Sequence, residues 1–130
     1  MIWRCDPALI QQLIHNLYTN AVKYNRPDGW IKFTLSSDGH MLELAIENTS
    51  ENIPADLKEK AFDRFYRGDV ARTRKVGGTG LGLSICHEIA MLHQGTLTLE
   101  PTRSQSVIVT LRAPLNEGDA TIMTNSSPSI

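Results

Sequence analysis

The sequence predicts an α+β domain in which helices cover one face of an antiparallel or mixed sheet. Two segments repeat apolar residues at helical spacing, residues 7–25 and 81–94. Four segments alternate apolar and polar residues, as strands with one buried face do: residues 30–36, 41–47, 96–100 and 106–112. The strands come in two consecutive pairs instead of alternating with helices, which favours the α+β class over a parallel α/β sheet.

The first helix has signals for its start and its end. Asp6 suits the N-cap, and Pro7 suits the first helical position. The turn sequence at residues 26–29 ends the helix, and residues 37–40 are a candidate hairpin turn between the first two strands. The apolar stripe predicted to face the core consists of Leu9, Ile10, Leu13, Ile14, Leu17 and Ala21.

The middle of the chain is less regular. Residues 48–52 are a loop by composition, and a short helix is expected from Pro54 to about Phe65. Residues 66–80 are polar, basic and rich in glycine, and a long loop of this kind inside a compact domain is usually functional or mobile. Gly95 is the predicted C-cap of the second long helix. We expect one domain over residues 1–115 and a disordered tail over residues 116–130.

Composition and charge exclude some classes of protein. The chain has 130 residues, and 13 Lys and Arg balance 14 Asp and Glu, which argues against a protein that coats nucleic acid or an anionic membrane. Cys5 and Cys86 have no metal-site or disulfide spacing, so we expect two reduced thiols. The sequence predicts neither a membrane-spanning helix nor a signal peptide.

A polar stripe borders the apolar face of the first helix. Asn16, Asn20 and Lys23 follow one another at helical spacing, with Tyr24 beside them. Amide oxygens can ligate Mg²⁺, and a lysine can bind phosphate. These residue types could equally form a solvated helix flank, and this alternative stays open.

A second candidate site is the glycine-rich segment at residues 77–83, Gly-Gly-Thr-Gly-Leu-Gly-Leu, which opens the second long helix. Glycines let backbone N–H groups approach an anion, and the helix N-terminus adds a positive dipole end. The segment is neither a P-loop nor a dinucleotide-binding fingerprint, because no Gly-Lys-Ser/Thr follows and no strand precedes it. A flexible hinge is the alternative.

Three motifs together resemble one family. Residues 16–23 (NLYTNAVK), 62–66 (FDRFY) and 78–83 (GTGLGL) resemble, in order and separation, the N, F and G2 boxes of the catalytic ATP-binding domain of bacterial sensor histidine kinases. The resemblance covers roughly residues 6–114. It implies the Bergerat (GHKL) fold, an α/β sandwich with a mixed sheet, helices on one face and a mobile ATP lid.

The resemblance also implies roles for single residues. Asn20 would ligate Mg²⁺ with help from Asn16, Lys23 would act beside them in catalysis, and residues 66–78 would form the lid. One among Arg67, Arg72, Arg74 and Lys75 would contact the γ-phosphate. The implied nucleotide contacts are Asn16, Asn20, Lys23, Tyr24, Asn48, Ile53, Arg67, Gly78, Thr79, Gly80, Leu81, Gly82 and Leu83.

One box departs from the family pattern. The family usually has Asp-x-Gly-x-Gly where this chain has residues 48–52, Asn-Thr-Ser-Glu-Asn. Asn48 offers a neutral acceptor to adenine where the family offers a carboxylate, as in some heavy-metal-responsive kinases, and we expect weaker nucleotide binding. Asn52 replaces a glycine with a residue that tolerates positive φ, whereas Ser50 tolerates it less well.

The resemblance implies a kinase domain with outside partners. Asn16 stands where related ATPases carry a carboxylate, and an amide is a poor general base. The domain would present the γ-phosphate of ATP to a histidine on a separate dimerisation and phosphotransfer domain of the same kinase, and would act on a response regulator indirectly. We expect an isolated domain that is monomeric, and a cytoplasmic position in a membrane sensor. Two alternatives are an anti-sigma-type serine kinase and a degenerate module that only binds partners.

Overall fold

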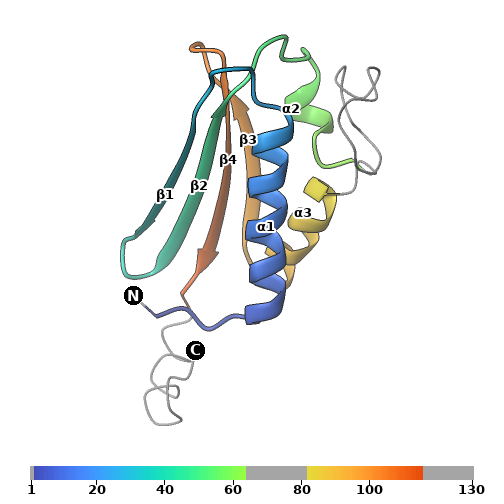
Figure 1. Cartoon of the computed structure of the whole chain (residues 1–130). Helices are drawn as coiled ribbons and strands as arrows, with labels where there is room; N and C mark the ends of the chain where they lie inside the picture. Colours follow the sequence, from blue (N-terminus) through green and yellow to red (C-terminus); the bar gives the residue numbers. More distant parts are fainter. Residues whose placement is uncertain (1, 64–81, 116–130) are drawn as a thin grey trace.

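The computed structural model describes residues 2–63 and 82–115 and has two layers, a sheet and a set of helices on one of its faces (Figure 1). The elements are α1 (Pro7–Lys23), β1 (Ile31–Ser37), β2 (Met41–Thr49), α2 (Leu57–Lys60), α3 (Gly82–Leu92), β3 (Thr96–Pro101) and β4 (Ser106–Pro114). This arrangement confirms the predicted α+β sandwich.

The described strands form one sheet in the order β1-β2-β4-β3, and each of these pairings is antiparallel. The register aligns Phe33 with Ile46, Ile46 with Val109, and Val109 with Leu99. Ile46, Val109 and Leu99 are buried, because the helices cover this side of the sheet. The core therefore lies between the sheet and the pair α1 and α3.

Helix α1 begins as predicted. The Asp6 carboxylate accepts hydrogen bonds from the backbone N–H groups of Ala8 and Leu9 at 3.0 and 3.2 Å. Leu13 and Leu17 are fully buried in the core that the helices share with the sheet, so most of the predicted apolar stripe is the core face. Ile14 was predicted to face the core with them, but it is 39% exposed and takes no part in the core cluster. The helix ends at Lys23, two residues before the predicted end at residue 25.

Helix α3 ends differently from the prediction. The N–H of Gly95 donates to Ala90 O and the N–H of Gln94 donates to Met91 O, the bond pair of a Schellman motif. Gln94, with φ of 61°, holds the left-handed position that the prediction gave to Gly95. Gly95 is needed for another reason: a Cβ there would lie 2.5 Å from Arg112 O. The predicted start at Leu81 lies outside the described residues.

Other boundaries also differ from the prediction. The predicted loop at residues 48–52 starts too early, because β2 continues through Asn48 and Thr49, which pair with Val107 and Ser106 of β4. Helix α2 covers only Leu57–Lys60 of the helix expected from Pro54 to Phe65, whose end lies outside the described residues.

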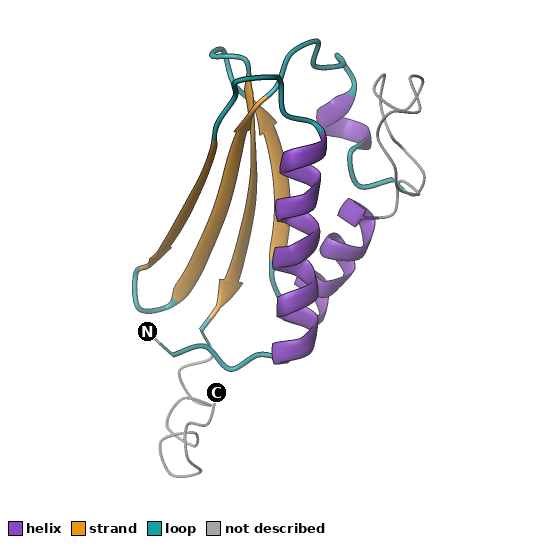
Figure 2. Cartoon of the chain, viewed as in Figure 1, coloured by secondary structure: helices purple, strands orange, loops and turns teal. Residues whose placement is uncertain are grey.

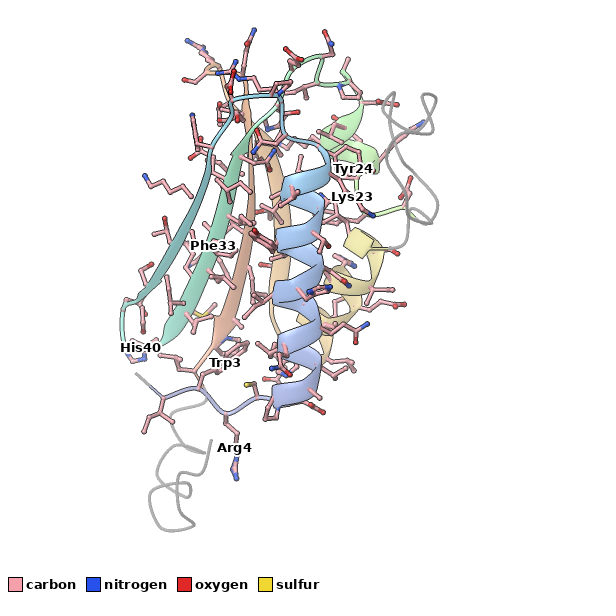
Figure 3. All side chains as sticks on the ribbon, in the orientation of Figure 1. Trp3, Arg4, Lys23, Tyr24, Phe33 and His40 are labelled. Atoms are coloured by element: carbon pink, nitrogen blue, oxygen red, sulfur yellow. The ribbon has the colours of Figure 1, made fainter. Side chains whose placement is uncertain are left out.

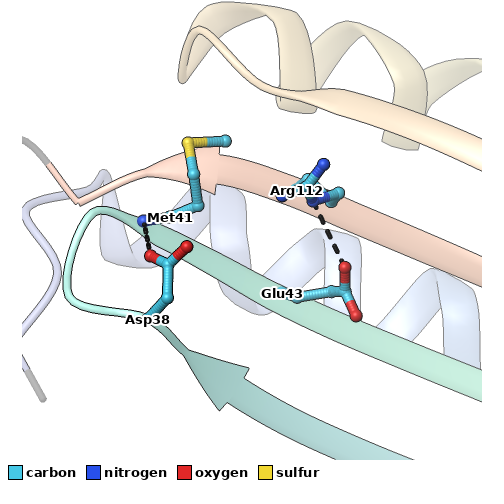
Figure 4. A network of polar contacts seen from close by, with 4 residues as sticks. All are labelled: Asp38, Met41, Glu43 and Arg112. Carbon is cyan, nitrogen blue, oxygen red and sulfur yellow. Dashed lines mark hydrogen bonds and ion pairs between the residues drawn. The ribbon is translucent and has the colours of Figure 1, made fainter.

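The helix-free face of the sheet is polar. Glu43 of β2 and Arg112 of β4 form an ion pair on it, with Oε2 and Nε 3.2 Å apart (Figure 4). At the β1–β2 turn, the Asp38 carboxylate accepts the N–H of Met41 at 2.8 Å, which confirms the predicted hairpin (Figure 4). Hydrogen bonds from the backbone N–H groups of Met41 and His40 lower the pKa of the Asp38 carboxyl. Within the described part of the chain, no helix has the length and apolarity to cross a membrane.

Candidate functional site

The polar stripe of α1 lies at the border of the core, as expected. Asn16 and Asn20 are half-buried, Lys23 is exposed, and Tyr24 caps the C-terminal end of the helix. Figure 3 shows Lys23 and Tyr24 at this end, on the side of α1 away from Phe33. The structure therefore brings together four of the predicted site residues along one edge of the helix.

Asn16 faces α3 through its contact with Cys86. Burial raises the pKa of the Cys86 thiol to about 12, and a hydrogen bond from the Asn16 side chain acts in the opposite direction. The same thiol lies 3.6 Å from Leu13 O, to which it donates. Cys86 therefore stays protonated at neutral pH and fixes Asn16 between the two helices.

Asn48 lies at the end of β2 on the helix side of the sheet, two residues after the buried Ile46. Its Nδ2 donates to Thr49 O at 2.9 Å. Because a carbonyl oxygen can only accept, this bond fixes the orientation of the amide, and the Oδ1 acceptor points away from Thr49. Ile53, further along the same segment, packs against the core.

A hydrogen-bond cluster that the sequence did not predict ties the end of α1 to the end of β2. Thr49 Oγ1 accepts the N–H of Trp30 at 2.9 Å and bonds to Asn25 Oδ1, while Asn25 Nδ2 donates to Trp30 O at 3.1 Å. Gly29 is required beside them, because a Cβ would collide with both side-chain oxygens. The cluster fixes Asn48 relative to the polar edge of α1. The only signal for this cluster in the sequence is Asn25, directly before the turn at residues 26–29.

The loop after β2 confirms one expectation. Asn52 has a φ of 57°, in the left-handed region that glycine adopts readily and that asparagine tolerates. Ser50 is buried, and its N–H donates to Gln105 O at 2.9 Å. The segment that replaces the two glycines is therefore anchored to the β3–β4 connection.

Two predicted phosphate-site residues begin α3. Leu83 packs against the core, and a Cβ added at Gly82 would meet no atom of the described residues within 4 Å. Packing against the described residues therefore does not require a glycine at position 82. Arg67, Gly78, Thr79, Gly80 and Leu81 lie outside the described residues, as does the predicted lid.

Residues 5–117 match the family described as histidine kinase-, DNA gyrase B- and HSP90-like ATPases. The chain belongs to this family. Members of the family are ATP-binding domains, and the fold and the order of the boxes agree with this assignment.

Several curated proteins are similar to the chain. Sensor protein kinase WalK of Staphylococcus saprophyticus is 37% identical over 119 residues, which are 88% of this chain and 20% of that protein. Sensor protein CiaH of Streptococcus pneumoniae is 42% identical over 103 residues, which are 79% of this chain and 23% of that protein. The chain thus spans about a fifth to a quarter of the length of these relatives.

Solved structures agree with the sequence comparison. The catalytic domain of histidine kinase ThkA matches with a TM-score of 0.73 and 32% identity, over 87% of this chain and 71% of that one. The mycobacterial sensor histidine kinase MprB matches with a TM-score of 0.75 and 26% identity, over 86% and 76%. The predicted resemblance to the catalytic domain of sensor histidine kinases is confirmed.

Proposed function

We propose that the chain binds ATP with Mg²⁺ and presents the γ-phosphate to a histidine on a separate dimerisation and phosphotransfer domain. The observation that carries the proposal is the polar edge of α1: Asn16 and Asn20 are half-buried on it, and the contact with Cys86 turns Asn16 toward α3. The first turn of α3 offers backbone N–H groups and the positive end of a helix dipole to an anion. A triphosphate would lie between these two groups.

Mg²⁺ fits the donor set at this edge. The ion prefers oxygen ligands, keeps several waters, and usually takes only one or two ligands from the protein and the rest from phosphates. Asn20 would supply the amide oxygen, Asn16 would assist, and Lys23 would neutralise phosphate charge. Bound Mg²⁺ would supply electrostatic stabilisation of the phosphate oxygens.

The adenine end of the nucleotide would lie near the end of β2. Asn48 Oδ1 would accept a hydrogen bond from the adenine amino group, and Ile53 would give apolar contact. Tyr24 would lie near the nucleotide. Arg67, Gly78, Thr79, Gly80, Leu81, Gly82 and Leu83 keep their proposed nucleotide contacts by resemblance.

The chemistry at Asn16 favours a kinase over an ATPase. A carboxylate one turn before the Mg²⁺ ligand could activate water, but an amide accepts no proton at neutral pH. Phosphoryl transfer depends mainly on positioning and electrostatics, so a nucleophile brought by the partner domain suffices. We propose that the chain works as the cytoplasmic catalytic part of a membrane sensor, with a response regulator as the indirect recipient.

The test is a calorimetric titration of the chain with a non-hydrolysable ATP analogue, with and without Mg²⁺. Asn20→Ala should abolish the Mg²⁺-dependent part of the affinity, a loss of about tenfold or more. Gln11→Ala is the matched control, because this exposed amide lies on the opposite side of α1 and should leave binding unchanged. Equal affinity in both variants would contradict the proposed site.

A degenerate module is the second candidate, and Asn48 in place of a carboxylate is the observation that favours it. A degenerate chain would not bind the ATP analogue at millimolar concentration, whereas a kinase domain would. The phosphotransfer domain of a similar kinase, supplied in trans with ATP, gives the decisive readout. Phosphohistidine on that domain would support the kinase, and its absence together with no nucleotide binding would support the degenerate module.

A further inference from the structure

Helices α1 and α3 run in opposite directions, so each turn of one helix lies beside a definite turn of the other (Figure 1). At one end, Asp6 N–H donates to His93 Nε2 at 3.0 Å. Further along, Cys86 contacts both Leu13 and Asn16. A step of one turn toward the C-terminus of α1 therefore matches a step of one turn toward the N-terminus of α3.

The turn above the Asn16–Cys86 contact carries residues of the proposed nucleotide site. Asn20 follows Asn16 by four residues, which is about one helical turn on the same face of α1. Gly82, where α3 begins, precedes Cys86 by four residues on the same face of α3. The Asn16–Cys86 contact is therefore the layer directly beneath the level of Asn20 and the first turn of α3.

The single proton of the Cys86 thiol determines the direction of its bond to Asn16. Sγ donates this proton to Leu13 O, 3.6 Å away. The sulfur can then only accept a hydrogen bond from Asn16, so the Nδ2 of the amide faces Cys86. The bond acts to lower the pKa of the thiol, as a donor to the sulfur does. Asn16 Oδ1 is consequently directed away from Cys86.

We propose that Cys86 is a positioning residue for Mg²⁺ binding, because its sulfur holds Asn16 Nδ2 and thereby presents Asn16 Oδ1 to the ion. Mg²⁺ takes oxygen ligands, and an amide in the opposite orientation would direct its N–H donors at the cation. Cys86 selects the first orientation. The inference rests on the proposed function, since it concerns a residue of the proposed nucleotide site.

Burial makes this selection effective. The Cys86 side chain is 0% exposed, so water is excluded from the sulfur and does not compete for the bond. Asn16 is only half-buried, so its other side remains accessible to an ion. A valine at position 86 would fill the core much as the cysteine does, but it would accept no hydrogen bond. The sulfur therefore has a role that packing alone does not supply.

Calorimetric titration with a non-hydrolysable ATP analogue, with and without Mg²⁺, measures the proposed role. Cys86→Val should weaken the Mg²⁺-dependent part of the affinity about three- to tenfold and leave the affinity without Mg²⁺ unchanged. Cys86→Ser keeps a group that donates to Leu13 O and accepts from Asn16, so it should bind more tightly than Cys86→Val when Mg²⁺ is present. Equal Mg²⁺-dependent affinity in the unaltered chain and in Cys86→Val would overturn the proposal.

Ile89→Val is the matched control for these substitutions. Ile89 lies on α3, is 3% exposed and packs in the same core as Cys86. The substitution changes core packing but leaves the bond between Cys86 and Asn16 in place, so the Mg²⁺-dependent affinity should stay unchanged. Circular dichroism confirms that each variant is folded.

A double-mutant cycle separates positioning from packing. Asn16→Ala should itself weaken Mg²⁺-dependent binding, because it removes the amide that Cys86 orients. In that background Cys86→Val should cause no further loss of affinity. A loss from Cys86→Val that is equally large with and without Asn16 would mean that position 86 acts only through helix packing, and the proposal would be wrong.

NMR of the nucleotide-free chain supplies a readout that needs no ligand. The Nδ2 protons of Asn16 should shift in Cys86→Val and lie closer to their original positions in Cys86→Ser, and unshifted protons in Cys86→Val would contradict the contact. The calorimetry distinguishes two failures. An unaltered chain whose nucleotide affinity does not depend on Mg²⁺ would contradict the proposed function and, with it, the role of Cys86. Mg²⁺ dependence that survives fully in Cys86→Val would contradict the role of Cys86 alone.

Discussion

At the residue scale, Asn48 determines how the domain would recognise adenine. It is buried at the end of β2, and its Nδ2 bond to Thr49 O fixes the amide with Oδ1 pointing away from that carbonyl. A neutral amide oxygen is a weaker acceptor than a carboxylate. The local backbone therefore preserves the position of the acceptor while the charge is lost.

Asn48→Asp should tighten binding of an ATP analogue about fivefold, because a charge-assisted hydrogen bond adds roughly 1 kcal/mol. The same change removes the Nδ2 bond to Thr49 O, so the free energy of unfolding without nucleotide should fall by roughly 1 kcal/mol. Calorimetry measures the first effect and urea unfolding the second.

Asn52→Asp is the control for that substitution. It adds a carboxylate to the same segment at an exposed position with positive φ. It should not tighten binding, because the added charge does not replace the acceptor at Asn48. Unchanged or weaker affinity in Asn48→Asp would show that Asn48 does not contact adenine.

At the element scale, sequence pattern predicted the interior of each element better than its ends. The N-terminal end of α1 was predictable because Asp6 and Pro7 act through neighbouring residues. The end of β2 was not, because Asn48 and Thr49 are extended by pairing with Val107 and Ser106, far along the chain. The same holds for the site: helical spacing predicted the Asn16–Asn20 edge, but not the Asn25–Thr49 cluster.

The end of α3 gives a prediction at this scale. Gln94 has a φ of 61°, which costs roughly 1 kcal/mol for a residue with a Cβ. Gln94→Gly removes that strain but adds freedom to the unfolded chain. The free energy of unfolding should rise by about 0.5 kcal/mol relative to Gln94→Ala, measured by urea unfolding.

The neighbouring glycine is the matched control. Gly95 has no room for a Cβ, because Arg112 O would lie 2.5 Å away and Ala113 Cβ 3.0 Å away. Gly95→Ala should therefore destabilise the chain by roughly 1–3 kcal/mol. If Gln94→Gly were no more stable than Gln94→Ala, the left-handed position would not limit the stability of this end.

At the scale of the whole molecule, hydrogen bonds at two places join α1 and its N-cap to α3 and the residue that follows it. At one end, Asp6 N–H donates to His93 Nε2 at 3.0 Å, and His93 Nδ1 lies 2.8 Å from Ile89 O. Further along, Cys86 is fully buried between the helices and bonds to Leu13 O and to Asn16. The helix layer that carries the proposed nucleotide site thus depends on a protonated thiol in the core.

Because of this thiol, the free energy of unfolding depends on pH in the alkaline range. Burial raises its pKa from 9.0 to about 12, so between these values the unfolded chain releases a proton that the folded chain keeps. Stability from the neutral thiol is complete below about pH 9 and is lost as the pH rises toward 12. The loss approaches about 1.4 kcal/mol per pH unit for one group.

Cys86→Ala should therefore be less stable than the unaltered chain at neutral pH by roughly 1–2 kcal/mol, because it leaves a cavity and removes the bonds to Leu13 and Asn16. The difference should shrink by roughly 1 kcal/mol between about pH 7 and about pH 10, since only the unaltered chain loses the thiol contribution. Urea unfolding of both chains at each pH measures the difference, and the titration of lysines and tyrosines cancels in it.

Cys5→Ala is the control, because Cys5 is only partly buried. The difference in the free energy of unfolding between Cys5→Ala and the unaltered chain should therefore change less with pH. A difference between Cys86→Ala and the unaltered chain that stays constant up to pH 10 would mean that the thiol ionises as easily in the folded chain as in the unfolded one, and α1 and α3 would then not exclude water from their contact.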